Sequence, residues 1–247
     1  MQVIMPCAGR SSRYPGTQPK YLLAMPDGRL MLEWAADNYL NKYPIRYIVS
    51  REHQEQYNSA KIIKDCFGNR QDVTVTVLDN ATNGPAETVY IGSLDIDNTA
   101  IIVQDCDSLF KFDIPEHSNF LCYIELADYP KLDAVASKSF MVINSPEDTV
   151  RNVVEKQVIS SRVCVGSYGF ESIEGFRKSF LSMQDNDREI FMSHCVKTML
   201  NSGEVFLARH AHSYHDLGSL DSYAKFRDNY INQHVDRDSD EFWKAIK

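Results

Sequence analysis

The first hundred residues alternate short apolar runs with segments whose apolar residues recur three and four positions apart. The short runs, each bounded by turn-forming residues, predict strands at 2–5, 46–49, 73–78 and 100–103. The segments with helical spacing predict helices at 32–43, about 53–67 and 84–94. Strands that alternate with helices in this way are typical of an α/β fold with a doubly wound, mostly parallel central sheet and helices on both faces.

The second half of the chain has a less regular pattern. It predicts strands near Tyr123 and at 132–143, 149–156, 162–170 and 205–209, and helices at 172–183, 190–202 and from Ser219 to about 232. No repeat, low-complexity tract or linker rich in Pro and Ser interrupts the chain. We therefore expect one domain over 1–247, with a nucleotide-binding half at about 1–115 and an acceptor-binding half at about 116–247.

Composition and charge exclude several classes of protein. Hydrophobic residues make up 43% of the 247 residues and charged residues 24%, as in an ordinary globular chain. The net charge of −8 argues against nucleic acid as a partner. No apolar run approaches the roughly 18 residues that span a bilayer, so no membrane partner is expected. The six cysteines are scattered, as in reduced proteins, so we expect a cytoplasmic location; homo-oligomerisation is left open.

A loop of small residues follows the first predicted strand. It runs from Ala8 to Arg13 and is followed by Pro19-Lys20. Small residues after a strand let backbone N–H groups approach a phosphate chain, and nearby cations neutralise its charge. The spacings of the Walker A and GxGxxG motifs are absent. Because simple turns have a similar composition, this loop alone leaves phosphate binding and a plain turn as equal alternatives.

The segment from Val3 to Leu32 resembles the signature of sugar-phosphate nucleotidyltransferases, [LM]xAGxGTR followed by PKxLL and PMLE. The matching segments are 5–13, 19–23, 27–29 and 30–33. Ser11 and Ser12 stand where the family has Gly and Thr. The resemblance implies a GT-A-like Rossmann fold in which Arg13 grips the β- and γ-phosphates of a nucleoside triphosphate and Lys20 lies beside the α-phosphate.

Weaker motifs of the same family follow in the family's order, so that the resemblance covers about 1–225. They are a nucleobase-binding turn at 83–88, a metal-binding strand end at 102–107, (I/V)xEK at 153–156, GxYxF at 165–170 and WxDxGT at 215–219. The resemblance implies catalytic roles for Arg13 and Lys20 and Mg²⁺ binding by Asp107 and Asp216. It implies nucleotide binding by Ala8, Gly9, Arg10, Ser11, Ser12, Gly84, Pro85, Glu87 and Asp105. It implies acceptor binding by Glu155, Lys156 and Gly166.

Five of these residues also have a structural alternative. Asp105 is either a second metal ligand or an Asx-turn residue that closes a strand. Glu87 either contacts the base or occupies the first turn of a helix. Asp216 either binds metal or stabilises the start of the next helix. Glu155 and Lys156 either meet the acceptor or form a solvated pair at a strand end.

Together the motifs predict an enzyme, a Mg²⁺-dependent nucleotidyltransferase. It would join a nucleoside triphosphate to a phosphorylated small molecule, most simply a sugar 1-phosphate for surface-polysaccharide or capsule synthesis, and release pyrophosphate. CTP is favoured because Glu87 can accept a hydrogen bond from the cytosine amino group. The alternatives are a cytidylyltransferase for a non-sugar phosphate such as phosphocholine, a GT-A glycosyltransferase that shares Asp105-x-Asp107, and a nucleotide-sensing regulatory subunit.

Overall fold

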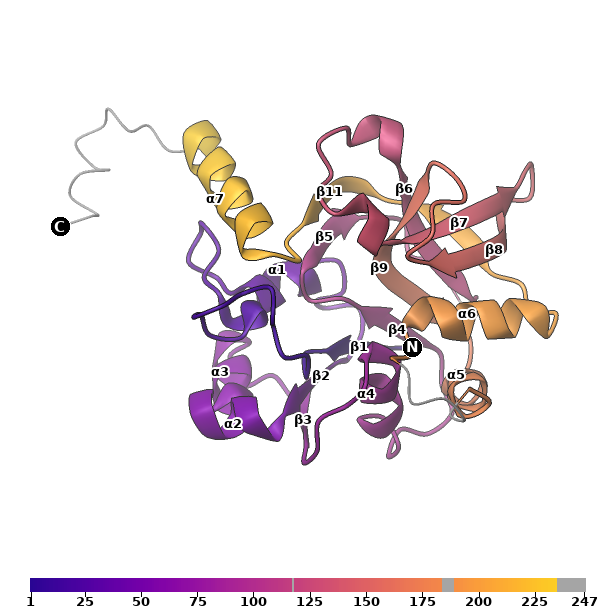
Figure 1. The fold of residues 1–247 in the computed structure, drawn as a ribbon. Helices are drawn as coiled ribbons and strands as arrows, with labels where there is room; N and C mark the ends of the chain where they lie inside the picture. The colour runs from indigo at the N-terminus through magenta and orange to yellow at the C-terminus, as the bar shows by residue number, and fades with distance from the viewer. Residues whose placement is uncertain (117, 184–188, 235–247) are drawn as a thin grey trace.

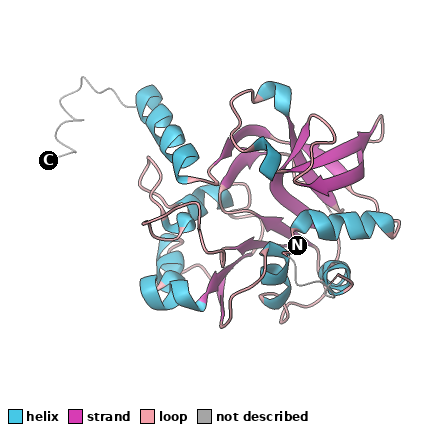
Figure 2. Cartoon of the chain, viewed as in Figure 1, coloured by secondary structure: helices cyan, strands magenta, loops and turns pink. Residues whose placement is uncertain are grey.

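A central sheet of nine strands runs through the molecule in the order β3-β2-β1-β4-β9-β6-β10-β8-β7 (Figures 1 and 2). This computed structural model describes residues 1–116, 118–183 and 189–234, so 235–247 of the expected acceptor-binding half lie outside it. The sheet strands are β1 (Gln2–Pro6), β2 (Ile45–Ser50), β3 (Val73–Leu78), β4 (Ile101–Gln104), β6 (Phe120–Glu125), β7 (Ser139–Asn144), β8 (Thr149–Glu155), β9 (Arg162–Phe170) and β10 (Leu207–His210).

The helices are α1 to α7, with three short 3-10 turns between them. Their bounds are α1 (Met31–Ala36), α2 (Arg51–Tyr57), α3 (Ser59–Cys66), α4 (Pro85–Ile91), α5 (Ile173–Leu181), α6 (Met192–Asn201) and α7 (Leu220–His234), and the 3-10 turns are Lys20–Leu22, Leu126–Asp128 and Val135–Ser137. A separate antiparallel pair is formed by β5 (Ser108–Lys111) and β11 (His212–Asp216).

One part of the sheet is parallel, as the sequence predicts. Strands β3, β2, β1 and β4 all run in the same direction, with Val3 of β1 opposite Ile45 on one side and Ile102 on the other. Side chains of β1 alternate between the two faces. Val3 and Met5 join the apolar layer that includes α1 and α3, whereas Ile4 joins the layer that includes α4, α5 and α6. Helices therefore cover both faces of the sheet, as expected.

The other part of the sheet is mixed rather than mostly parallel, which corrects the predicted fold class. Strand β9 runs antiparallel to β4 and β6, and β8 runs antiparallel to β7 and β10. A short connection explains one of these pairings. Only residues 145–148 join β7 to β8. A parallel crossover needs about a dozen residues or more, so β7 and β8 can be neighbours only in the antiparallel sense.

Several predicted elements have different limits. The helix expected at about 53–67 is two helices, because Asn58 adopts the left-handed conformation with φ of 54°. The helix expected at 32–43 ends at Ala36, and hydrogen-bonded turns continue to Tyr43. In the segment 132–143, only the part from Ser139 onward is a strand. Strands β5 and β11 were not predicted.

The segment after β11 returns to the N-terminal part of the chain. The Tyr14 hydroxyl donates a hydrogen bond to the Leu217 carbonyl, and the Leu220 N–H donates to the Arg13 carbonyl at 3.2 Å. Farther along, the ring of Phe226 in α7 packs edge-on against Trp34 of α1, with centroids 5.7 Å apart. These contacts hold the end of β11 next to the loop that follows β1.

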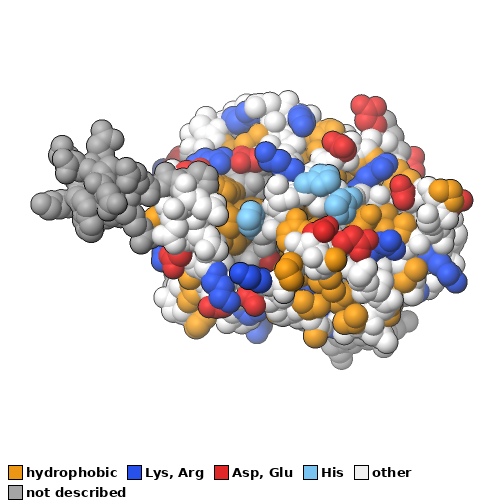
Figure 3. Space-filling model, turned by 90° about the horizontal axis from the view of Figure 1, so that it is seen from above, with side chains coloured by type: hydrophobic (Ala, Val, Ile, Leu, Met, Phe, Trp, Pro, Cys, Tyr) orange, Lys and Arg blue, Asp and Glu red, His pale blue; other side chains and the backbone are white. Residues whose placement is uncertain are grey.

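Two surface properties bear on partners. Within the described ranges, no helix combines the length and apolar character needed to cross a bilayer. On the face shown in Figure 3, Lys and Arg side chains are interspersed with Asp and Glu.

Candidate active site

A cleft of about 610 Å³ opens at the carboxyl ends of β1 and β4. Its size is in the range of small-molecule sites, and the carboxyl ends of parallel strands are where open α/β sheets bind ligands. Every predicted site residue except Glu87 and Lys156 lines this cleft. The lining set from the prediction is Ala8, Gly9, Arg10, Ser11, Ser12, Arg13, Lys20, Gly84, Pro85, Asp105, Asp107, Glu155, Gly166 and Asp216.

The loop after β1 forms one wall of the cleft. Ser11 has φ of 50°, in the left-handed region that glycine adopts at little cost. The family that the sequence resembles has Gly at this position. This chain has Ser, but its backbone still adopts the left-handed conformation. The Ser11 Oγ also accepts a hydrogen bond from the Lys20 N–H at 3.3 Å, which ties the loop to the Pro19-Lys20 segment.

The end of β4 meets β9 in the middle of the cleft. The Asp105 N–H donates to the Gly166 carbonyl at 2.8 Å. Gly166 has φ of 84°, and a Cβ atom placed on it would lie 2.4 Å from Asp105 Oδ2. Only glycine allows the Asp105 side chain to occupy this position, so Gly166 acts on the site through Asp105.

The end of β11 brings the second aspartate to the first. Asp216 lies opposite Ser108 in the β5–β11 pair, and the Leu217 N–H donates to the Asp107 carbonyl at 2.8 Å. A Cβ atom placed on Gly218 would lie 3.2 Å from Arg13 Nη1. Arg13 therefore reaches this junction, and the structure describes no carboxylate in an ion pair with it. Asp107, Asp216 and Arg13 converge although they are far apart in the sequence.

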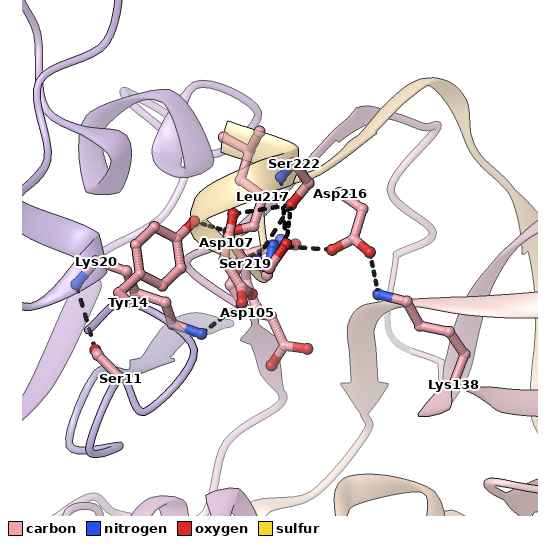
Figure 4. Close-up of polar contacts among 12 residues, drawn as sticks. Ser11, Tyr14, Lys20, Asp105, Asp107, Lys138, Asp216, Leu217, Ser219 and Ser222 are labelled. Carbon is pink, nitrogen blue, oxygen red and sulfur yellow. Dashed lines mark hydrogen bonds and ion pairs between the residues drawn. The ribbon is translucent and has the colours of Figure 1, made fainter. Parts of the chain in front are cut away.

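Two lysines approach the two aspartates from opposite sides (Figure 4). Lys20 forms an ion pair with Asp107, and Lys138 Nζ lies 2.5 Å from Asp216 Oδ2. Burial acts against both charges of the first pair, but mutual attraction outweighs it. The attraction between the two charges lowers the pKa of Asp107 and raises the pKa of Lys20. Both groups are therefore charged at neutral pH.

Asp105 behaves differently from Asp107. Burial, together with the negative charge of Asp107, raises the pKa of Asp105 to about 7. At neutral pH this carboxyl group is close to half protonated, so it can donate a hydrogen bond as well as accept one.

Glu87 and Lys156 lie outside the cleft lining. Glu87 accepts a hydrogen bond from the Asn83 N–H, so it closes the turn before α4. The Lys156 side chain is exposed, with its ammonium 4.1 Å from the centroid of the Phe191 ring. The neighbouring Glu155 does line the cleft, but the hydroxyls of Ser139 and Ser193 already donate to it.

The cleft also includes residues that the sequence prediction missed. Lys138 precedes β7 in a segment that was assigned to a strand, and no motif marks it. The aromatic residues Tyr14, Tyr21, Tyr168, Phe191 and Tyr214 also line the cleft. Tyr21 and Tyr168 lay within the quoted motifs PKxLL and GxYxF, and Tyr14 directly follows Arg13. Phe191 and Tyr214 lie far along the chain from these residues, and no motif marks them.

The donor set is compatible with Mg²⁺. In the described part of the chain, no group of three or more His, Cys, Asp or Glu side chains is placed to hold a metal by itself. Mg²⁺ in nucleotide sites is bound by one or two carboxylates together with substrate phosphates and water, and Asp107 and Asp216 match that requirement. Each is neutralised by a lysine, and a metal ion could take over that role.

Comparisons with solved structures identify the fold. The chain is similar to a nucleoside-diphosphate-sugar pyrophosphorylase from Vibrio cholerae, with 21% identity over 92% of this chain and 100% of the other and a TM-score of 0.78. It is similar to a UDP-glucose pyrophosphorylase solved with UDP-glucose, with 16% identity over 94% and 99% of the two chains and a TM-score of 0.74. It is also similar to the inositol-1-phosphate CTP transferase of T. maritima, with 14% identity over 95% and 97% and a TM-score of 0.70.

These likenesses show that the chain has the fold of nucleotide-sugar pyrophosphorylases and related nucleotidyltransferases. The resemblance seen in the sequence is confirmed at the level of the fold. A scan against protein-family models gives no match, and neither does a search of curated protein sequences.

Proposed function

We propose that the protein is a nucleotidyltransferase that joins a nucleoside triphosphate to a phosphorylated small molecule. The observation that carries the proposal is the convergence of Arg13, Lys20, Asp107 and Asp216 on one cleft, in a fold shared with pyrophosphorylases. An oxygen of the acceptor phosphate attacks the α-phosphorus, the bond to the bridging α,β-oxygen breaks, and pyrophosphate leaves. The protein's task is to align two polyanions and to offset their charge.

Each wall of the cleft has a part in this reaction. The loop 8–12 cradles the triphosphate, and Arg13 stabilises the charge that develops on the leaving pyrophosphate. Lys20 lies beside the α-phosphate. Asp107 and Asp216 hold Mg²⁺, which offsets the charge of the phosphate oxygens. The turn at Gly84 and Pro85 is the proposed base site, whereas Glu155 and Gly166 lie toward the acceptor. The preference for CTP loses its basis, because Glu87 is not part of the cleft lining and accepts from the Asn83 N–H.

The proposed acceptor is a sugar 1-phosphate that feeds surface-polysaccharide synthesis in the cytoplasm. This is supported by structural relatives that include a UDP-glucose pyrophosphorylase. The second candidate is a non-sugar phosphate such as phosphocholine. The five aromatic residues of the cleft favour it, because aromatic faces attract quaternary ammonium groups.

A matrix of nucleoside triphosphates and phosphate acceptors, assayed for pyrophosphate with Mg²⁺ present, tests this function. We expect release only when a triphosphate and its acceptor are both supplied. A GT-A glycosyltransferase would instead consume a nucleotide sugar without releasing pyrophosphate. If no pair in a broad matrix gives pyrophosphate, the proposed function is wrong.

A further inference from the structure

The cations of the cleft are unevenly distributed. Arg10, Arg13 and Lys20 all come from the N-terminal part of the chain, next to the phosphate loop. In the described residues from 118 onward, Lys138 is the one Lys or Arg that lines the cleft. The proposed reaction brings together two substrates that each carry phosphate. The side of the cleft opposite the phosphate loop therefore needs a cation of its own, and Lys138 supplies it.

The position of Lys138 is fixed by its backbone. Its N–H donates to the Val135 carbonyl at 3.1 Å, and its carbonyl accepts from the Lys156 N–H at 3.0 Å. The side chain is 16% exposed and extends across the cleft to Asp216 (Figure 4). A lysine held at its base and largely buried loses less side-chain entropy on binding a ligand than an exposed one.

Lys156, the lysine that the sequence motif indicated, is placed differently. Its side chain is exposed and is not part of the cleft lining, although its ammonium lies over the ring of Phe191, which does line the cleft. The two lysines belong to adjacent segments, since their backbones are hydrogen-bonded to each other. Of this pair, only Lys138 is part of the cleft lining.

We propose that Lys138 binds the phosphate group of the acceptor. This inference rests on the proposed function and deepens it by assigning the acceptor phosphate to one residue. In the ligand-free protein, Asp216 holds the Lys138 ammonium inside the cleft. A phosphomonoester dianion then competes with the Asp216 carboxylate for the same ammonium and forms charge-assisted hydrogen bonds with it.

The test is direct binding of two phosphomonoester probes, glucose 1-phosphate and phosphocholine, measured by isothermal titration calorimetry in EDTA. Glucose and choline serve as matched controls without the phosphate. We expect the wild-type protein to bind at least one probe, Lys138→Met to bind it about tenfold or more weakly, and Lys138→Arg to retain most of the affinity. Lys156→Met, the matched control on the neighbouring segment, should change the affinity less than about twofold.

A second variant separates phosphate binding from a structural role of the ion pair. Asp216→Asn frees the Lys138 ammonium, so it should strengthen probe binding by up to about fivefold in EDTA. The same substitution made together with Lys138→Met should give no gain. A gain that persists in the double variant would mean that Asp216 acts through its general field or through Arg13, and would overturn the proposal.

The proposal is also overturned if the wild-type protein binds neither probe, or if Lys138→Met binds as tightly as wild type. These results differ from those that would refute the proposed function. Lys138-dependent probe binding without pyrophosphate release in the substrate matrix would refute the function and leave the phosphate site in place. Pyrophosphate release that is unchanged in Lys138→Met would refute Lys138 as the phosphate site and leave the proposed function in place.

Discussion

The two halves of the sheet build their shares of the cleft by different means. In the N-terminal half, β1 and β4 are parallel neighbours, so the loop after β1 and the residues after β4 meet at one edge automatically. In the C-terminal half, antiparallel pairings bring Gly166 to Asp105 and Asp216 to the Asp107 segment. The first arrangement follows from strand direction, because parallel neighbours end at the same edge of a sheet even when they are far apart in the sequence, as β1 and β4 are. The second depends on the antiparallel register of particular pairs, and its functional residues lie in separate strands and loops.

The largest effect on turnover is expected at Asp107, which is paired with Lys20 and hydrogen-bonded through its carbonyl to Leu217 after β11. Asp107→Ala should reduce turnover by about a thousandfold or more and remove the Mg²⁺ dependence of nucleotide binding, because it deletes a metal ligand and leaves Lys20 without its partner. Pyrophosphate release, with nucleotide titrations in Mg²⁺ and in EDTA, measures both. Wild-type activity in this variant would show that the halves do not meet through Asp107.

Asp105, which follows β4 and is hydrogen-bonded to Gly166 of β9, should make the stability of the protein depend on pH. The pKa of Asp105 is raised to about 7 in the folded protein, against roughly 3.9 when unfolded. The folded state therefore binds this proton more tightly, and its ionisation costs stability as the pH rises from about 4 through 7. Asp105→Asn removes this cost and should stabilise the protein by up to about 4 kcal/mol above pH 7.

Urea unfolding of both proteins in EDTA, from pH 5 to pH 8, measures this difference. The gain in unfolding free energy should shrink steadily toward pH 5. An equal gain at all pH values would mean that Asp105 is ionised throughout, as a fixed metal or cation ligand would be.

The phosphate-loop side should respond more narrowly. Arg13→Ala should lower kcat by about a hundredfold, or about 3 kcal/mol, because it removes charge stabilisation at the leaving pyrophosphate. The KM for the acceptor should change little, since Arg13 belongs to the opposite wall. Steady-state kinetics with each substrate varied in turn gives both values. A large change in acceptor KM with an unchanged kcat would contradict the assignment of Arg13 to the triphosphate side of the cleft.

The same division explains what sequence reasoning achieved. The parallel strands and the segments that carry Arg13, Lys20 and Asp107 lie in compact motifs, where spacing along the chain is close to spacing in the fold. Glycine at 166 could be recognised as part of a motif, but its contact with Asp105 depends on the antiparallel register of β9. Lys138 has neither a motif nor a periodic pattern around it. Its role emerges only when β7, β8 and β11 are placed together.

The smallest effect is expected within the phosphate loop. Ser11→Gly relieves a left-handed conformation, worth roughly 1–2 kcal/mol for a residue with a side chain. It also removes the hydrogen bond from the Lys20 N–H, worth roughly 0.5–1.5 kcal/mol, and adds backbone freedom to the unfolded chain. These terms nearly cancel, so thermal unfolding should shift by less than about 1 kcal/mol. A larger loss would show that the hydroxyl is the main link between the two motifs.

The fate of the two ends of the triphosphate tests the central claim most directly. The protein is incubated with Mg²⁺, the acceptor selected from the substrate matrix, and the matching nucleoside triphosphate labelled at either the α- or the γ-phosphate. The account predicts that the α-label moves into the acceptor product and the γ-label leaves in pyrophosphate, in equal amounts. Release of the γ-label as orthophosphate, or recovery of the α-label in a free nucleotide without an acceptor adduct, would contradict it.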